Sequence, residues 1–464
     1  MKNTPFEDID RILSAQKRYF DSGATLSIDF RKEMLKRLQK ALKEWEKPLC
    51  DALWQDLHKS YEEAYLTELS IVSAEVRSHL KNIRRWARRE RKCTPLKLFP
   101  SSSYIVQFPP LGNTLVVSPW NYPVQLLLNP LVGAISSGCT AILKPSPYVP
   151  HVSETIGRMI SGTFPPEYVA VVQGNREVNS YLFEQKFDLI FFTGSPDLGR
   201  KVMAAASRNL TPVILELGGK SPCIIDRSAN IKTTAKRIAW GKTLNAGQTC
   251  IAPDYLITHE DIKDKFVCEY AKAVTELHGK DIKSDTHYVR MVSDKAFDRV
   301  SSYLNEGEVI YGGELDKSSR YIAPALIDRA PMDSPVMNEE IFGPVFPIVT
   351  FGGDEKEFSD KVAEFINGRE KPLAFYYFGK EKTGWELIRR TSSGGGCIND
   401  CIMHIANENI PFGGVGNSGL GRYHKRESFE AFTHRRSIVT TCTLVDLPFR
   451  YMPYRMFSLV KKIL

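Results

Sequence analysis

"DLIFFTGSPDLGRKV" (residues 188–202) passes from an apolar strand through a glycine-containing turn into a helix. A helix that starts directly after such a turn presents free backbone N–H groups and the positive end of its dipole to an anion. The glycine spacing, Gly194-x4-Gly199, differs from the G-x-G-x-x-G dinucleotide fingerprint. The stretch therefore predicts a strand-turn-helix unit whose turn either binds a phosphate or is only structural.

The same alternation of short apolar runs and helical stretches continues on both sides of this unit. Residues 7–93, further upstream, have the three- and four-residue apolar spacing of helices. Apolar runs separated by helices are typical of βαβ units in a parallel sheet. The runs and helical stretches are "TLVVSP" (114–119), "QLLLNPLVGAISSG" (125–138), "TAILKPS" (140–146), "SETIGRMISG" (153–162), "YVAVVQG" (168–174) and "PVILELGG" (212–219).

A second alternation begins near residue 219 and predicts a second α/β domain. Its strand candidates include "SPCIID" (221–226), "YLITH" (255–259), "FPIVTF" (346–351) and "LAFYYF" (373–378), with helices expected over 230–246 and 261–278. A chain of 464 residues is too long for one core, so more than one domain is expected. "SYIVQFPP" (103–110) and "RRSIVTTCTLV" (435–445) alternate like exposed strands outside both alternations, as suits an arm for subunit contact.

The net charge of +8 is concentrated in one short run. "KNIRRWARRERK" (81–92) carries seven basic residues and one glutamate. It has a single aromatic residue, Trp86, and no nucleic-acid recognition motif. We therefore expect a solvated helix face with Ile83 and Trp86 turned inward, and no nucleic-acid partner.

Cysteine usage and hydropathy bear on the compartment. The nine cysteines are scattered, and the charged start "MKNTPFEDID" is not a secretory leader, so a reducing, cytoplasmic location is expected. No apolar run approaches the roughly 20 residues that span a bilayer. The apolar, basic end "YMPYRMFSLVKKIL" (451–464) suits a docked terminal helix or a weak membrane-surface contact.

Three residues stand out as chemical candidates. Cys250, in "NAGQTCIAPDY" (245–255), is a thiol on a loop after small residues, although burial is the commoner fate of a free cysteine. Glu216 lies in an apolar strand before Gly218 and Gly219, where burial would raise its pKa toward that of a general base; otherwise it faces solvent. Asn121, in "SPWNYP" (118–123), either caps the helix expected from Pro123 or donates N–H to an oxyanion.

Two further sets are weaker. Lys144, at the end of "TAILKPS", places a cation where doubly wound sheets bind cofactors, beyond the carboxyl ends of the strands. Cys397, Cys401 and His404 in "CINDCIMH" resemble a metal knuckle. Structural zinc needs four ligands, commonly from two paired clusters, and the sequence has no second cluster. We therefore predict no metal.

Taken together, these stretches resemble the aldehyde dehydrogenase superfamily. The matching motifs occur in the family's order: "PWNYP" (119–123), "KPS" (144–146), "FTGS…G" (192–199), "LELGGKSP" (215–222), "GQTC" (247–250), "EEIFGPV" (339–345) and "PFGGVGNSG" (411–419). "DLHKS" (56–60), "RYIAPALI" (320–327) and "SFEAFTHRRS" (428–437) extend the similarity to the class 3 branch, whose members act on fatty and aromatic aldehydes.

The resemblance implies an α/β aldehyde dehydrogenase-like fold. A Rossmann-type cofactor-binding domain would comprise residues 1–98 and 111–217, and a catalytic α/β domain residues 218–420. The strands in 99–110 and 430–446 would form a small β oligomerisation arm, and 447–464 a C-terminal tail. It also implies a homodimer that oxidises medium- or long-chain aliphatic or aromatic aldehydes to carboxylic acids, with NAD or NADP as cofactor.

The resemblance also implies roles for individual residues. Cys250 would be the nucleophile, Asn121 and the Cys250 backbone N–H the oxyanion hole, and Glu216 the base for the hydrolytic water. Glu340 would contact the nicotinamide ribose, and Phe342 would lie near the nicotinamide. The expected cofactor-binding residues are Trp120, Lys144, Ser146, Gly194, Ser195, Gly199, Leu217, Glu340 and Phe342.

One departure from the family pattern concerns cofactor choice. Many members have "KPSE", whose glutamate binds the adenosine ribose, whereas here Pro147 follows Ser146. Loss of that carboxylate predicts that NADP is accepted as well as NAD. Acylating or phosphate-dependent relatives lack the hydrolytic glutamate, so Glu216 argues against them. Retention of Cys250, Glu216 and Asn121 argues against a non-enzymatic protein of the same fold.

Overall fold

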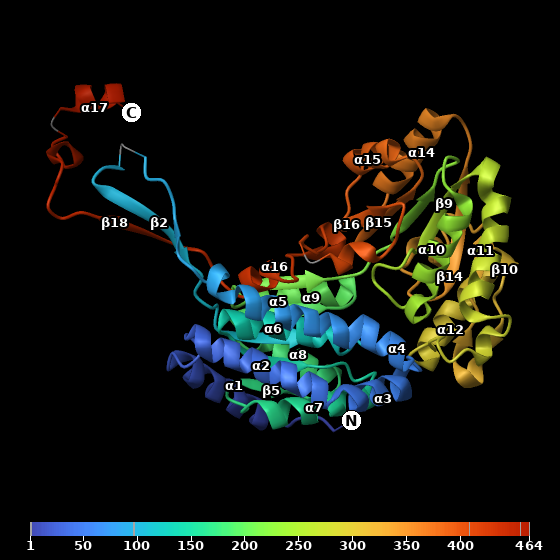
Figure 1. Cartoon of the computed structure of the whole chain (residues 1–464), viewed down its shortest axis with the longest axis horizontal. Coiled ribbons are helices and arrows are strands. Elements are labelled where there is room, and N and C mark those ends of the chain that lie inside the picture. The colour runs from blue at the N-terminus through green and yellow to red at the C-terminus, as the bar shows by residue number, and fades with distance from the viewer. Residues whose placement is uncertain (1, 96–97, 408, 455, 464) are drawn as a thin grey trace.

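The computed structural model describes residues 2–95, 98–407, 409–454 and 456–463. Two α/β units lie side by side, and a narrow arm projects from the first of them (Figure 1). The first unit is built on a six-stranded sheet of order β17-β7-β6-β3-β4-β5. All neighbours in it are parallel except β17 and β7. Its strands are β3 (Asn113–Val117), β4 (Thr140–Lys144), β5 (Val169–Val171), β6 (Leu189–Thr193), β7 (Val213–Glu216) and β17 (Gly419–Leu420).

The strand order of this sheet reverses between β3 and β6. From β3 the chain proceeds to β4 and β5 on one side, then crosses back to β6 and β7 on the other. Ligands of doubly wound sheets bind at such a switch point, beyond the carboxyl ends of the strands. The segments that follow β3 and β6, which contain Asn121 and Gly194, therefore begin at the expected place for a cofactor.

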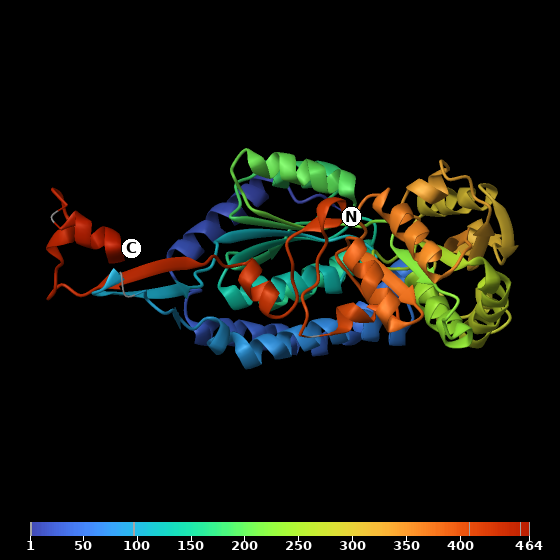
Figure 2. The same ribbon diagram turned by 90° about the horizontal axis from the view of Figure 1, so that it is seen from above.

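Helices cover both faces of the six-stranded sheet, because successive strand residues point to opposite sides. Leu115, Ile190 and Phe192 pack with α1, α8 and α9, whereas Val116 and Phe191 belong to the core formed with the opposite helices. Figure 2 shows α9, in green, on one side of the sheet and the blue helices α2 and α5 on the other. The helices are α1 (Phe6–Asp21), α8 (Arg176–Glu184) and α9 (Pro196–Ser207) on one face, and α2 (Ile28–Glu44), α3 (Glu46–Leu57), α5 (Ser70–Trp86), α6 (Gln125–Ser137), α7 (Pro150–Thr163) and α16 (Arg426–Ala431) on the other.

The second unit is built on a seven-stranded sheet of order β10-β13-β14-β9-β8-β15-β16, parallel except for β10. Its strands are β8 (Pro222–Ile225), β9 (Tyr255–His259), β10 (Glu308–Tyr311), β13 (Ala325–Asp328), β14 (Val345–Phe351), β15 (Ala374–Phe378) and β16 (Gly395–Ile398), and β11 (Leu315–Asp316) pairs with β12 (Tyr321–Ile322) outside it. Its helices are α10 (Ile231–Thr243), α11 (Lys263–His278), α12 (Asp294–Ser302), α13 (Pro335–Asn338), α14 (Glu355–Asn367) and α15 (Glu381–Arg390).

The helix predicted over 230–246 is too long. Regular α-helix ends at Thr243, because Asn245, Ala246 and Gly247 have left-handed φ angles of 53°, 52° and 72°. L-residues rarely adopt this conformation, and it cannot continue a right-handed helix. The chain is thereby turned away from the helix axis just before Cys250.

The arm is a three-stranded antiparallel sheet of order β1-β2-β18, formed by β1 (Glu90–Arg91), β2 (Ser101–Gln107) and β18 (Arg436–Thr441). Every residue of β18 is exposed. The short helix α17 (Phe457–Ile463) lies beyond the tip of the arm, far from both α/β units (Figures 1 and 2). None of the helices in the described part of the chain is both long and apolar enough to cross a membrane.

The basic run 81–92 was expected to be one helix face, but it is divided between two elements. Helix α5 ends at Trp86, and Glu90 and Arg91 belong to β1. The inward orientation of Ile83 and Trp86 is confirmed, because both side chains are buried in the core.

Candidate active site

The loop that carries Cys250 is fixed by its own backbone. A Cβ atom on Gly247 would lie 2.4 Å from the Gly343 carbonyl oxygen, so only glycine fits at this left-handed position. Gln248 is fully buried. Its amide donates hydrogen bonds to the Asn245 and Arg290 carbonyl oxygens and accepts one from the Val292 N–H. The loop therefore holds Cys250 in one position, where the residue is half-buried.

The Cys250 thiol is surrounded by groups that oppose its ionisation. Burial raises its pKa far above the ordinary value, and Glu340 and then Glu216 add to the increase. Because the thiolate is the nucleophile, this environment keeps the thiol protonated until charge nearby changes. The two carboxyl groups that act on the thiol are the two that the sequence motifs predict in its site.

Glu216 is the last residue of β7, and it does not face solvent. Its exposed fraction is 3%. Neither carboxylate oxygen has a hydrogen-bond partner among the described residues. Burial raises its pKa well above the usual range, which makes this carboxylate a stronger proton acceptor than an exposed glutamate. A buried, unpartnered carboxyl with a raised pKa is typical of a general base and unusual for a structural residue.

Asn121 follows β3 and is 2% exposed. It is not a helix cap, because α6 begins at Gln125 and the residue at its cap position is Val124. The Asn121 Nδ2 donates to the Gln248 carbonyl oxygen at 3.0 Å. Next to it, the Tyr122 hydroxyl and the Thr249 Oγ1 are hydrogen-bonded at 2.7 Å. A hydrogen bond from a side chain to the backbone thus joins the loop after β3 to the Cys250 loop, which lies about 130 positions further along the sequence.

The turn at 194–199 packs tightly against the end of β7. A Cβ on Gly199 would lie 2.7 Å from the Leu217 side chain, and one on Gly194 would lie 2.5 Å from the Phe192 ring. Ser195 is the N-cap of α9 and is exposed. Its side chain makes none of the capping hydrogen bonds found at other described helices. The first-turn N–H groups of this 12-residue helix therefore remain available to a phosphate at the switch point.

Lys144 ends β4 and is 1% exposed. Burial lowers its pKa to about 8, and its Nζ donates to the Pro145 carbonyl oxygen at 2.9 Å. The Ser146 hydroxyl accepts a hydrogen bond from the Tyr148 N–H. Arg176, at the start of α8, donates to the Tyr148 hydroxyl at 3.1 Å. A second cation therefore lies beside the Ser146–Tyr148 turn, where many relatives of the predicted family have a carboxylate instead of Pro147.

The segment after α13 brings Glu340 and Phe342 to the site. The Glu340 carboxylate rests against Gly218, where a Cβ would lie 2.1 Å from its Oε2. Burial, and then the charge of Asp254, raises the pKa of Glu340 to about 8. Phe342 has a left-handed φ of 50°, and its ring meets the Trp120 ring edge-on at 5.4 Å. Of the nine expected cofactor residues, Lys144 is the last residue of β4, and the other eight belong to the segments that follow β3, β4, β6 and β7 or to this 340–342 segment.

Sequence reasoning missed two buried ion pairs that hold these loops. Lys220 and Asp254 are joined at 2.6 Å. Lys220 also donates to the Val336 and Glu339 carbonyl oxygens, and Asp254 accepts from the Ile341 N–H. Lys59 and Glu68, joined at 2.7 Å with both side chains fully buried, lie beside Asn121. In the sequence, these ion pairs are visible only as charged residues near a motif, and such residues usually lie on a solvated surface.

The three residues that resemble a metal knuckle, which we did not expect to bind a metal, have other partners. The Cys397 Sγ lies 3.6 Å from the His404 Nδ1, and the Cys401 thiol donates to the Arg237 carbonyl oxygen at 3.1 Å. Over the residues that the structure describes, no group of three or more His, Cys, Asp and Glu side chains is arranged to hold a metal ion.

These features define the class of protein. A doubly wound parallel sheet has an uncapped helix N-terminus, a buried lysine and close-packed glycines at its switch point, all of which fit a dinucleotide. A thiol, an amide and an unpartnered carboxyl converge beside it. The chain is therefore a nicotinamide-dependent oxidoreductase with a cysteine at its centre.

Comparisons with known proteins identify the family. The model of the aldehyde dehydrogenase family matches residues 1–438. The chain is 43% identical over 442 residues to a 4,4'-diaponeurosporen-aldehyde dehydrogenase of Staphylococcus aureus, with 95% of each chain covered. It is 42% identical over 426 residues to the dimeric NADP-preferring aldehyde dehydrogenase of Rattus norvegicus, covering 92% of this chain and 93% of that one.

A solved structure agrees with this assignment. The substrate-bound state of Staphylococcus aureus AldH superposes with a TM-score of 0.95 at 42% identity, covering 98% of this chain and 99% of that one. The chain belongs to the aldehyde dehydrogenase family. It is an enzyme that oxidises aldehydes with NAD or NADP, and the predicted fold, function and cofactors are confirmed.

Proposed function

We propose that Cys250 adds to the aldehyde carbonyl and that Asn121 and the Cys250 N–H stabilise the resulting alkoxide. The observation that carries this proposal is the hydrogen bond from Asn121 to Gln248, which binds the amide to the thiol's own loop. A neutral donor stabilises developing negative charge without holding it as an ion pair. Removing one such donor typically slows a reaction by about 10²–10³.

Glu216 serves first to take the thiol proton and later to activate water. Bound NAD or NADP would supply the acceptor for the hydride that leaves the alkoxide carbon, and Cys250 would then carry a thioester. After the thiol proton has passed from Glu216 to solvent, Glu216 removes a proton from water as the water attacks the thioester and returns it to the departing thiolate, so that the carboxylic acid and the free thiol are released. Burial raises the pKa of Glu216, which makes the carboxylate a stronger base than an exposed glutamate and so suits both transfers.

Cofactor contacts follow from the positions of the chain's own residues. The first turn of α9, with Gly194, Ser195 and Gly199, would bind the pyrophosphate. Lys144 and Ser146 would bind the adenosine ribose, and Glu340 the nicotinamide ribose. Trp120, Leu217 and Phe342 would pack near the nicotinamide half. The unit containing the six-stranded sheet is thus the cofactor-binding domain, and the unit containing the seven-stranded sheet is the catalytic domain.

Medium- and long-chain aliphatic or aromatic aldehydes are the proposed substrates. The Staphylococcus aureus relative at 43% identity is named for a diaponeurosporen aldehyde, which supports a long apolar substrate. Aromatic side chains near Cys250, such as Tyr122 and Tyr376, would suit a long apolar substrate. The Tyr122 hydroxyl is hydrogen-bonded to Thr249, and the Tyr376 hydroxyl donates to the Ile251 carbonyl oxygen.

The arm and tail suit assembly. The fully exposed strand β18 offers an unpaired edge to a second copy, as expected for a homodimer; the rat relative is named dimeric. Exposed Met452, Tyr454 and Phe457, together with the lysines of α17, suit weak contact with a membrane surface. Nine free cysteines suit the cytoplasm.

A panel of aldehydes assayed by NAD(P)H formation tests this function, with Cys250→Ala as the control. We expect turnover of apolar aldehydes by the unaltered enzyme. The variant should show no turnover, while cofactor binding followed by tryptophan fluorescence remains unchanged. Residual oxidation by Cys250→Ala above about a thousandth of the original rate would contradict the role of the thiol.

A further inference from the structure

The loop of Asn121 is held from behind by a buried network that the proposed chemistry does not itself use. Lys59, in the connection between α3 and α4 (Tyr61–Ala64), has a fully buried ammonium group with three donors to satisfy. It bonds to the Glu68 Oε1 at 2.7 Å and to the Asn121 carbonyl oxygen at 3.1 Å, and it lies 4.2 Å from the centre of the Tyr122 ring. The hydrogen bonds and the ring contact of the ammonium therefore go to the Asn121–Tyr122 loop and to its counter-ion, and the buried Glu63 carboxyl also interacts with it electrostatically.

Glu68 connects this lysine to the next helix. It lies in a single π-helical turn (Tyr65–Leu69) and is fully buried. Its second oxygen accepts the N–H groups of Val124 and Gln125 at 2.8 and 3.2 Å. These groups are at the start of α6, where a carboxylate is stabilised by the helix dipole. The pair thus holds the segment from Asn121 to Gln125 at both ends.

Asn245 completes the network from the other loop. Its Nδ2 donates to the Asn121 and Gln248 carbonyl oxygens, at 3.0 Å each. Its left-handed backbone is one that asparagine tolerates better than most residues. The Gln248 carbonyl therefore accepts from two amides, those of Asn121 and Asn245, and the loops of the amide and the thiol are tied at two points.

We propose that Lys59, Glu68 and Asn245 are positioning residues that aim the Asn121 amide at the alkoxide formed on Cys250. This inference rests on the proposed role of Asn121. Burying an ion pair seldom stabilises a protein more than apolar side chains of the same volume would, so stability alone does not account for the pair. A donor displaced by about 1 Å loses much of its hydrogen bond, which explains why the backbone behind Asn121 is held so closely.

The test uses Asn245→Gly, which keeps the left-handed backbone and deletes only the amide, and Lys59→Met, which deletes the ammonium. Lys263→Met is the matched control, because Lys263 pairs with Asp328 at 2.6 Å in a largely buried site of the second unit. The first-turnover rate of NAD(P)H formation, the cofactor Kd and Tm are measured for each variant, alone and in an Asn121→Ala background.

We expect both network variants to slow the first turnover by about 10- to 100-fold, part of the loss typical of a missing oxyanion donor. Cofactor Kd should remain within twofold. In the Asn121→Ala background the network variants should cause no further loss, because they act through that amide. Lys263→Met should lower Tm without slowing the first turnover.

Other outcomes separate the two proposals. If Asn121→Ala slows turnover but Asn245→Gly and Lys59→Met do not, the positioning role is wrong and the oxyanion role stands. Losses that multiply with that of Asn121→Ala show a general structural effect and also overturn the inference. A full rate for Asn121→Ala overturns the proposed oxyanion role itself. If Lys59→Met does not fold, Asn245→Gly decides alone.

Discussion

The active site has two buried ion pairs that do different work. Lys59–Glu68 is completely buried and holds the carbonyl of a proposed catalytic residue, Asn121. Lys220–Asp254, with side chains 9% and 6% exposed, instead holds the 336–341 backbone from which Glu340 projects. In each region a buried charge orients the backbone. Burying two ions is costly because both lose their hydration, unless hydrogen bonds satisfy both of them. Substitutions in the Lys59–Glu68 pair should therefore alter rate constants, and substitutions in the Lys220–Asp254 pair should alter cofactor binding.

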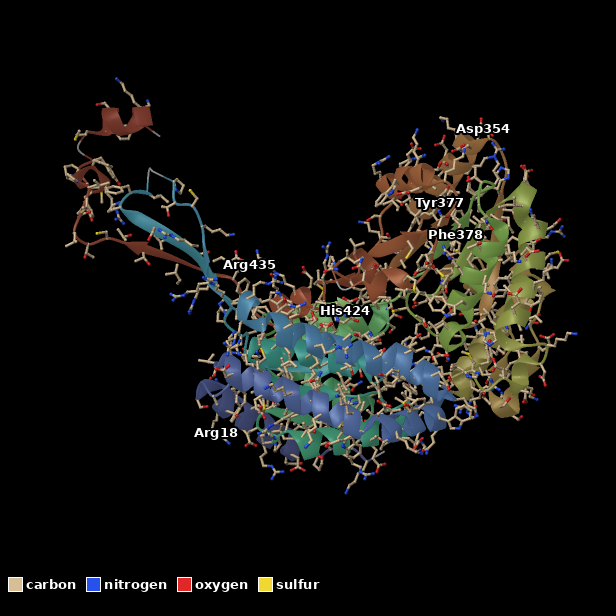
Figure 3. The ribbon with its side chains drawn as sticks, in the orientation of Figure 1. Arg18, Asp354, Tyr377, Phe378, His424 and Arg435 are labelled. Carbon is tan, nitrogen blue, oxygen red and sulfur yellow. The ribbon has the colours of Figure 1, made fainter. Side chains whose placement is uncertain are left out.

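Figure 3 labels residues of both units near the site. His424 is labelled in the first unit, close to α16, and Tyr377 and Phe378 are labelled in β15 of the second unit. Burial raises the pKa of Tyr423, next to His424, and the charges of Glu216 and Cys250 raise it further. The proposed catalytic residues Glu216 and Cys250 therefore lie close to the segment before α16.

The largest effect is expected from Glu216→Gln, on the catalytic side. An amide of the same shape cannot accept a proton, so steady-state turnover should fall by about 10²–10⁴. Stopped-flow measurement at pH 9 should still show one equivalent of NAD(P)H, because hydroxide can take the thiol proton while the thioester persists. Steady-state turnover within tenfold of the unaltered enzyme would show that the base lies elsewhere.

Lys220→Met should produce the next largest effect, and this effect should fall on cofactor binding rather than on the catalytic rate. Loss of the ammonium frees the Val336 and Glu339 carbonyls and leaves Asp254 unpaired, so the segment with Glu340 loses its position. We expect KM for NAD(P) to rise about 10- to 100-fold while kcat at saturating cofactor changes by less than threefold. An equal fall in kcat would erase the proposed contrast between the two ion pairs. Lys263→Met provides the control for loss of a buried pair.

A smaller effect, about tenfold, is expected at the adenosine end of the cofactor. Pro147→Glu restores the carboxylate common in relatives, which should repel a 2′-phosphate and lower kcat/KM for NADP relative to NAD. Arg176→Ala should lower the same ratio, because its exposed guanidinium donates to the Tyr148 hydroxyl, close to Pro147. Kinetics with both cofactors check this. A preference of the unaltered enzyme for NAD above about a hundredfold, ~2.7 kcal/mol, would contradict the premise.

Much of the fold could be predicted because the strands of both parallel sheets are local apolar runs between glycines and prolines. The end of the 230–246 helix could not, because the left-handed turn at Asn245 is held by tertiary hydrogen bonds rather than by a helix-breaking residue. In the proposed site, Cys250, Glu216 and Asn121 could be proposed from the sequence because each lies in an unusual local context. Lys59 and Glu68 were not found, since their roles depend on partners that only folding brings together.

The smallest and most specific effect concerns the Cys250 thiol. Its pKa is raised first by burial and then by Glu340, whose own pKa is about 8. Below pH 8 Glu340 is mostly protonated and neutral, so Glu340→Gln should hardly change the alkylation of Cys250 by iodoacetamide at pH 7. Above pH 8 the variant lacks a negative charge that opposes the thiolate, so alkylation should be about two- to fivefold faster than in the unaltered enzyme.

Alkylation of Cys250→Ala, measured in parallel, removes the contribution of the exposed thiols Cys93, Cys268 and Cys442. An equal acceleration at pH 7 and pH 9 would mean that Glu340 is ionised throughout and that burial does not govern its charge. No acceleration at pH 9 would mean that Glu340 does not reach the thiol electrostatically. In that case the cofactor side and the catalytic side of the site would be coupled through backbone alone.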